Sequence, residues 1–156
     1  MPALLEWPAK VNGGTTTDYP AVTSDYLPTI LDLLGMERID ARPFDGLSLL
    51  PVLRDGITTR AEPIAFETRG GAGTMMSRNS PHVGLIENRF KLLTDFSPTG
   101  EGDMLFDLLT DPGETTNLAE ESRSQVMAMK AFLTTWRAGC AQSATGADYT
   151  LATSSP

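Results

Sequence analysis

Hydrophobic residues change their spacing near residue 63, and this change limits the folds that the chain can adopt. The apolar residues between positions 27 and 34 recur at helical intervals and would share one face of a helix. From residue 63 onward the apolar positions alternate with small or polar ones, beginning with Ile64 and Phe66, as in half-buried strands. Helices followed by antiparallel strands indicate an α+β fold.

The segment before residue 63 contains two short helical patterns with the same boundary signals. One runs from Asp25 to Gly35 and the other from Ser48 to Gly56. Each has a polar N-cap, a proline in the first turn and a glycine that can end the helix in the left-handed conformation. Ahead of these helices, an apolar run at residues 4–7 predicts a buried strand.

The segment after residue 63 predicts a four-stranded antiparallel sheet covered by a C-terminal helix. Strands are expected at residues 64–66, 83–86, 90–93 and 104–108. The second and third strands would form a hairpin. The helix is expected from residue 121 to 138 and would end at Gly139. Its buried stripe would consist of Val126, Met129, Leu133 and Trp136.

The composition excludes several classes of protein. The chain has 20 acidic and 12 basic side chains, and its net charge of −8 opposes binding to nucleic acid or to an anionic membrane surface. No apolar run approaches the roughly 20 residues that span a bilayer. Because Cys140 is the only cysteine and His82 the only histidine, an internal disulfide and a Cys/His metal cluster are both excluded.

The first ten residues, MPALLEWPAK, have neither a basic leader nor a continuous apolar core. They are therefore not expected to form a signal peptide. The sequence as shown favours the cytoplasm, and export would require a signal upstream of these residues. The sequence therefore assigns no cellular compartment.

Five phrases of the sequence occur in an order that indicates a known family. They are PALLEWPAKV, SDYLPTILDLLG, FDGLSLLPVLRDG, NRFKLL and LFDLLTDPGETTNLA, and they lie within residues 2–119. In this order they resemble the C-terminal third of formylglycine-dependent sulfatases, the arylsulfatase family of the alkaline-phosphatase superfamily, although Ala9 stands where glycine is usual. Asp-Gly and Asp-Pro-Gly form turns and Pro-Thr starts a helix, so the phrases identify a scaffold and not a catalytic site.

The resemblance implies three regions. Residues 1–60 would be the C-terminal remnant of an alkaline-phosphatase-like α/β core. Residues 61–140 would be the sulfatase C-terminal subdomain, with the four-stranded sheet and its helix, and residues 141–156 a flexible tail. Because the remnant normally completes a larger core, we expect it to expose apolar side chains at Leu4 and along the helix at 27–34.

The resemblance also implies a chemistry for which this chain lacks the reacting groups. Sulfatases of this kind use a formylglycine made from the cysteine of a Cys-x-Pro/Ala-x-Arg motif, and a calcium ion held by Asp and Asn side chains. Cys140 is followed by Ala-Gln-Ser-Ala, which does not match that motif, and the family's Asp-Asp and Asp-Asn metal pairs are missing from the sequence. Asp25 and Asp45 are explained better as a helix cap and a turn residue than as metal ligands. We therefore expect no catalytic residue and no metal ligand in this chain, with calcium and formylglycine in a missing N-terminal part.

Three basic residues are candidates for substrate binding: Arg69, Arg78 and His82. The two arginines belong to a long loop at about 69–81, and His82 follows this loop just before a strand. In the family, loops beside the C-terminal sheet overhang the active-site pocket. These side chains can therefore donate hydrogen bonds to a sulfate group or a sugar hydroxyl. The alternative is a solvated loop whose basic residues pair with nearby acids.

The leading interpretation is a C-terminal fragment of a sulfatase, inactive alone, that supports the fold and rims the substrate pocket. Its partner in the complete enzyme would be a sulfated small molecule or a sulfated glycan. One alternative is a fragment of a related phosphodiesterase or phosphonate hydrolase, since these share the scaffold phrases. Another is a non-enzymatic module that binds a sulfated glycan or a partner protein, although the acidic net charge weighs against binding to polyanions.

Overall fold

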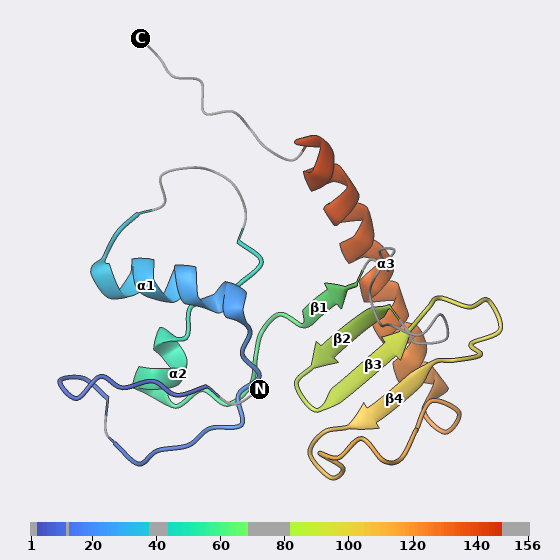
Figure 1. The fold of residues 1–156 in the computed structure, drawn as a ribbon, viewed down its shortest axis with the longest axis horizontal. Helices are drawn as coiled ribbons and strands as arrows, with labels where there is room; N and C mark the ends of the chain where they lie inside the picture. The colour runs from blue at the N-terminus through green and yellow to red at the C-terminus, as the bar shows by residue number, and fades with distance from the viewer. Residues whose placement is uncertain (1–2, 12, 38–43, 69–81, 148–156) are drawn as a thin grey trace, which may run out of the picture. The chain divides into compact units, whose positions relative to one another are not determined.

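The described part of the chain forms two compact units. The computed structural model describes residues 3–11, 13–37, 44–68 and 82–147. The first unit includes the described residues up to Ala61, and the second unit includes those from Glu62 onward (Figure 1). Each unit has its own packing and its own polar contacts.

The first unit contains a 3-10 turn, Thr23–Asp25, and two short helices, α1 (Tyr26–Leu34) and α2 (Leu50–Asp55). Gly35 and Gly56 follow the two helices with φ of 63° and 66°. Glycine adopts this left-handed conformation readily because it has no Cβ. Both predicted helices and both predicted C-terminal ends are confirmed, whereas the N-cap predicted at Ser48 is wrong, because Leu49 occupies that position.

The buried strand predicted at residues 4–7 is wrong. This segment is irregular, and Leu4 is 96% exposed. No strand lies beside it among the described residues of the first unit, so its main chain has no ladder of hydrogen bonds to join. The chain turns instead, and the N–H of Lys10 donates to the carbonyl of Trp7 at 3.0 Å.

The apolar face of helix α1 is not covered by other residues of the first unit. Leu27, Ile30 and Leu34 are 54%, 50% and 65% exposed. The residues that α1 buries are Pro28 and Thr29. The expected exposure of this face is confirmed, and the first unit therefore keeps a large apolar surface uncovered.

The second unit is built on a sheet of four antiparallel strands in the order β1-β2-β3-β4, as the sequence predicts. The strands are β1 (Ile64–Glu67), β2 (Val83–Glu87), β3 (Phe90–Thr94) and β4 (Met104–Asp107). β2 and β3 form the expected hairpin. Val83 at the start of β2 lies opposite Glu67 on β1 and Thr94 on β3. The last residues of β1 and β3 therefore meet the first residue of β2 at one end of the sheet.

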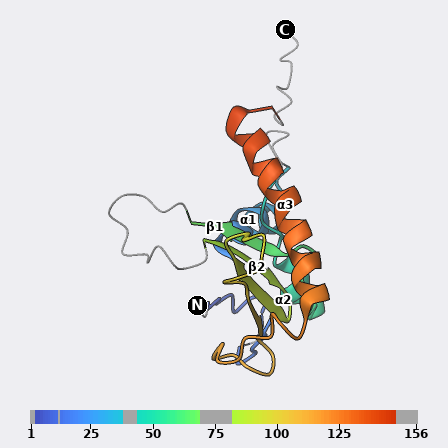
Figure 2. The ribbon, with the colours of Figure 1, turned by 90° about the vertical axis from the view of Figure 1, so that its right-hand side faces the viewer.

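Helix α3 (Arg123–Thr145) lies along one face of this sheet and closes the hydrophobic core (Figure 2). The buried core side chains are Val83, Leu85, Leu92 and Leu105 from the sheet and Val126, Met129 and Leu133 from the helix. Trp136 is partly buried against them, so the predicted helical stripe is confirmed. Burying one such side chain stabilises the fold by about 1.5–3 kcal/mol. No helix among the described residues is long and apolar enough to cross a membrane.

The C-terminal end of α3 differs from the prediction. The helix continues through Gly139 to Thr145 and ends at Gly146, which has φ of 74°. Glycine allows the left-handed conformation but does not require it, and inside a helix it costs only about 1 kcal/mol relative to alanine. Residues 141–145 of the predicted tail are therefore helical, and residues 148–156 lie outside the described part of the chain.

Candidate functional site

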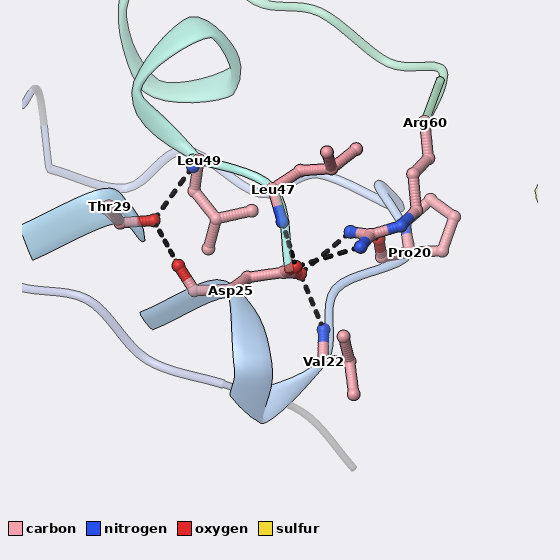
Figure 3. A network of polar contacts seen from close by, with 7 residues as sticks. All are labelled: Pro20, Val22, Asp25, Thr29, Leu47, Leu49 and Arg60. Atoms are coloured by element: carbon pink, nitrogen blue, oxygen red, sulfur yellow. Dashed lines mark hydrogen bonds and ion pairs between the residues drawn. The ribbon is translucent and has the colours of Figure 1, made fainter. Parts of the chain in front are cut away.

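A buried carboxylate joins two of the family phrases in the first unit. Asp25 is fully buried, and Figure 3 shows its side chain at the centre of a polar network. Its oxygens accept hydrogen bonds from the main-chain N–H groups of Val22 at 2.9 Å and Leu47 at 2.8 Å. Both oxygens also accept from the guanidinium of Arg60, at 2.8 and 2.9 Å. Asp25 occupies the predicted N-cap position of α1, but its side chain makes no capping bond to that helix.

The same network sets the ionisation of Asp25. Burial is the largest influence and would by itself raise the pKa of this carboxyl, because it penalises the charged form. The hydrogen bonds from Arg60, Val22 and Leu47 act in the opposite direction and hold the pKa of Asp25 below its ordinary value. Since Arg60 is itself only 3% exposed, removing either partner would leave the other charge buried.

Thr29 and Gly46 bring the segment before α2 against α1 and the 3-10 turn that precedes it. Thr29 Oγ1 donates to the carbonyl of Asp25 at 2.6 Å and accepts from the N–H of Leu49 at 2.9 Å (Figure 3). Gly46 lies against the main chain of Ser24, where a Cβ would come within 2.1 Å of the carbonyl oxygen. The Asp-Gly pair is therefore needed for the close approach of two chain segments as well as for the turn.

Two ion pairs join the phrases NRFKLL and LFDLLTDPGETTNLA in the second unit. Arg89 Nε donates to Asp107 at 2.8 Å, and the guanidinium also bonds the second carboxylate oxygen. Lys91 Nζ donates to both oxygens of Glu114, at 2.8 and 2.6 Å. The hydrogen bond from Arg89 is the main reason that the pKa of Asp107 lies far below its usual range.

Asn117 ties the segment after β4 to the outer edge of the sheet. Its Oδ1 accepts from the N–H of Leu105 at 3.0 Å, and its Nδ2 donates to the carbonyl of Asp103 at 3.1 Å. The N–H of Leu118 donates to the carbonyl of Leu105 at 2.8 Å. These bonds satisfy polar groups on an edge strand that would otherwise be open to pairing. Four of the five phrases thus hold the scaffold together.

The described residues do not form a site for calcium or formylglycine. Among them, no group of three or more His, Cys, Asp and Glu side chains is arranged to hold a metal ion. A cation at Asp25 would have to displace Arg60, because the carboxylate already accepts four hydrogen bonds. Cys140 is exposed on α3, and the residues after it do not match the formylglycine motif.

One end of the sheet in the second unit holds His82, a predicted substrate-binding residue. Its N–H donates to Asp95 Oδ1 at 2.7 Å. Its carbonyl accepts from the N–H of Thr68 at 2.8 Å and from Thr68 Oγ1 at 3.3 Å. Residues just beyond β1 and β3 thus hold the main chain of His82 from both sides.

The imidazole of His82 is held differently from its main chain. The residue is half-buried, and Nδ1 is enclosed without a hydrogen-bond partner among the residues that the structure describes. A buried polar atom in this state costs roughly 1–3 kcal/mol, so such atoms are rare. The other two predicted binding residues, Arg69 and Arg78, lie outside the described residues.

Two cations of α3 lie near the same end of the sheet. The guanidinium of Arg137 is 5.2 Å from the centroid of the Phe96 ring, and Lys130 Nζ is 5.8 Å from it. Arg137 also pairs with Glu67 at 3.0 Å, and Lys130 pairs with Asp103 at 2.7 Å. Both cations are therefore already partnered, and their contacts hold Phe96 in place.

A groove of about 600 Å³ lies beside α3 in the second unit. Phe96 and Met127 contribute apolar surface to it, and Lys130 and Arg123 contribute charge. Both of these cations are paired with acidic neighbours. The groove has the volume of a ligand site, but its cations are not free to bind an anion, and His82 does not line it.

Sequence reasoning did not find Asp95 and Thr68, the residues that hold His82. The signal for Asp95 lies in the hairpin register, since counting outward from the turn places residue 95 opposite residue 82. Thr68 follows from the pairing of β1 with β2. That pairing joins strands separated by a long loop, and no local pattern specifies it.

Comparisons with known proteins agree with the phrases and the fold. Residues 1–137 match the family model described as N-sulphoglucosamine sulphohydrolase, C-terminal. Choline-sulfatase of Rhizobium meliloti (strain 1021) is 34% identical over 128 residues, which are 81% of this chain and 22% of that protein. N-acetylglucosamine-6-O-sulfatase of Bacteroides thetaiotaomicron is 28% identical over 132 residues, which are 80% of this chain and 23% of that protein.

A solved structure extends the likeness to the fold. BT4656 in complex with its substrate D-glucosamine-2-N,6-O-disulfate has a TM-score of 0.61 and 25% identity, covering 84% of this chain and 27% of that one. This chain therefore spans about a quarter of the length of the relatives that it matches. It belongs to the N-sulphoglucosamine sulphohydrolase C-terminal family and corresponds to the C-terminal portion of a sulfatase.

Proposed function

We propose that this chain completes a sulfuric ester hydrolase, in which it supports the fold and borders the substrate pocket through His82. The single observation that carries the role of His82 is the contrast between its main chain and its ring. Three hydrogen bonds hold the main chain, whereas Nδ1 of the ring is buried without a partner among the described residues. A side chain on a firmly held main chain beside a sheet is well placed to orient a ligand.

The proposed substrate is a sulfate ester of a small molecule or of a sugar. Two relatives are named for esters of this kind, one of choline and one of N-acetylglucosamine, and BT4656 was solved with a disulfated glucosamine. These esters share sulfate oxygens, which accept hydrogen bonds from an imidazole N–H. Arg69 and Arg78 are proposed as further donors to the same group.

The reacting groups are assigned to the part of the relatives that this chain does not match. In sulfatases, formylglycine supplies the nucleophile and calcium stabilises the charge of the sulfate group. His82 would then bind and orient substrate without taking part in bond cleavage. A residue with this role acts mainly on binding and alignment of the ester.

A chimaera tests the proposal. Residues 1–147 replace the matching C-terminal segment of the Rhizobium meliloti choline-sulfatase, and the product is assayed with choline sulfate and N-acetylglucosamine 6-sulfate. We expect hydrolysis of at least one ester above that of a mock purification. His82→Ala should lower kcat/KM by about ten- to a hundredfold without a change in Tm, as expected for a lost substrate contact.

Glu101→Ala is the matched control, since it removes an exposed carboxylate from the connection between β3 and β4 in the same unit. A chimaera that folds but hydrolyses no sulfate ester would contradict the proposal. Preferential hydrolysis of a phosphodiester or a phosphonate would favour the related hydrolases instead. If His82→Ala lowers Tm and leaves kcat/KM of the folded protein unchanged, His82 is structural.

A further inference from the structure

We propose that Asp95 is a positioning residue for His82 and that the ring of His82 donates a hydrogen bond through Nε2 to an acceptor oxygen of the ligand. The inference rests on the proposed function for the identity of that ligand, a sulfate ester. The geometry of Asp95 and His82 stands on the contacts of the second unit alone.

The chain around Asp95 is held by contacts that do not involve His82. Thr94 Oγ1 donates to the carboxylate of Asp103, a buried residue, at 2.5 Å and accepts from the N–H of Phe96 at 2.9 Å. Phe96 has φ of 59°, so the chain leaves the direction of β3 directly after Asp95. Both neighbours of Asp95 are therefore held, and its carboxylate accepts the N–H of His82 at 2.7 Å.

The opposite side of His82 is held by the end of β1. Thr68 donates to the carbonyl of His82 from its N–H and from Oγ1. The neighbouring Glu67 is anchored to α3 through its ion pair with Arg137. Asp95 and Thr68 thus fix the main chain of His82 between them, and with it the point from which the ring extends.

The enclosed Nδ1 decides which nitrogen carries the proton in the neutral ring. A buried N–H without an acceptor loses its bond to water, whereas an incompletely bonded acceptor atom is more common in folded proteins. The proton is therefore placed on Nε2, and His82 presents an N–H donor there. A neutral donor suits a sulfate or hydroxyl oxygen, and it does not suit a cationic group such as the trimethylammonium of choline.

The 156-residue chain itself allows a direct test, because His82 is its only histidine. Nitrogen NMR of chain labelled with ¹⁵N-histidine reports the tautomer of the neutral ring at about pH 8. We expect the Nε2–H tautomer to predominate in the folded chain more strongly than in the same chain unfolded in urea. Hydrogen exchange of the His82 amide reports the bond to Asp95 separately.

Variants of Asp95 separate positioning from general stability. Asp95→Ala should bring the tautomer ratio closer to that of the unfolded chain and speed exchange of the His82 amide about five- to tenfold. Asp95→Asn keeps an acceptor oxygen and should behave like the parent chain. Glu101→Ala should also match the parent, since its carboxylate is exposed on the same connection between β3 and β4.

The Nδ1–H tautomer in the folded chain, or Asp95→Ala indistinguishable from the parent in both measurements, would overturn the inference whatever the chimaera does. In an active chimaera, Asp95→Ala should raise KM more than it lowers kcat, and Asp95→Asn should restore KM. An unchanged KM in Asp95→Ala would also overturn it. An inactive chimaera counts against the proposed function alone, and the NMR measurements then decide the positioning role.

Discussion

The second unit closes an apolar core between a sheet and a helix, whereas the first unit is organised around one buried ion pair. Among the described residues of the first unit, Leu50 is the one large hydrophobic side chain that is buried. Its most enclosed polar group is the carboxylate of Asp25, paired with Arg60. Hydrophobic burial drives folding, while a buried ion pair adds little net stability because both charges lose their water.

The two units therefore differ in how completely each encloses its own apolar side chains. The second unit encloses a core of apolar side chains between its own sheet and helix. The first unit leaves the apolar face of α1 exposed, with Leu34 at 65%. We therefore expect the second unit to be the more stable one in this chain. The first unit should depend on its polar network for a defined structure.

Breaking the buried ion pair should have the largest effect. Arg60→Ala leaves the Asp25 carboxylate buried without its cation, which typically costs about 3–5 kcal/mol. Hydrogen-exchange mass spectrometry should show lost protection in residues 22–37 and 44–60 and unchanged protection in residues 83–133. The double variant Asp25→Leu/Arg60→Met is the control and should be milder, since no buried charge remains. Equal loss in both units would contradict the separation between them.

Opening the core of the second unit should have the next largest effect. Leu133 is fully buried, and Leu133→Ala should lower the free energy of unfolding of this unit by about 2–5 kcal/mol. Met127 lies on the same helix and is 71% exposed, so Met127→Ala should change stability by no more than about 0.5 kcal/mol. Urea denaturation followed by tryptophan fluorescence measures both. Similar midpoints for the two variants would contradict the assigned core.

Acidification should weaken the first unit through Asp25. Its pKa in the folded unit lies below the ordinary value, so the unfolded chain binds the proton more tightly. The stabilisation is therefore complete above the unfolded pKa of about 3.9 and is lost as the pH falls through the lower, folded value. Exchange protection of residues 22–37 and 44–60 should fall on acidification through this range. Asp25→Asn should lack this component, and an identical pH profile in that variant would refute it.

Removing a partly exposed ion pair of the second unit should have the smallest effect. Lys91 and Glu114 keep 20% and 33% of their side chains exposed, so Glu114→Gln should cost less than about 1 kcal/mol. The difference should shrink further at high salt, because salt screens exposed charges. A change in urea midpoint as large as that of Leu133→Ala would mean that polar contacts, and not the core, stabilise this unit.

Local sequence patterns predicted the elements well where the structure depends on near neighbours. Gly35 and Gly56 end their helices as expected, and the hairpin between β2 and β3 lies where the alternating residues predicted it. The same kind of signal was wrong at Gly139, where α3 continues, and at residues 4–7, where no strand forms. A strand forms only beside a partner strand, and whether a helix ends at a glycine depends on its surroundings. A short stretch of sequence contains neither piece of information.

The candidate site likewise combines a residue that the sequence singles out with residues that only the fold brings to it. His82 stands out in the sequence as the only histidine, next to a long loop. Asp95 and Thr68, which form hydrogen bonds with its main chain, could be identified only once the strand register was known. The role of Asp25 also required a distant residue, because Arg60 lies 35 positions further along the chain.

The sequence by itself determined the family, the order of helices and strands and the mismatch of Cys140 with the formylglycine motif, since these depend on residue types and short spacings. The tertiary structure alone decided that Asp25 pairs with Arg60, that Asp95 and Thr68 hold the main chain of His82 and that Nδ1 of His82 is enclosed. These three features are set by contacts between segments far apart in the chain. Burial and hydrogen bonding at such contacts depend on how the segments pack, which no local pattern encodes.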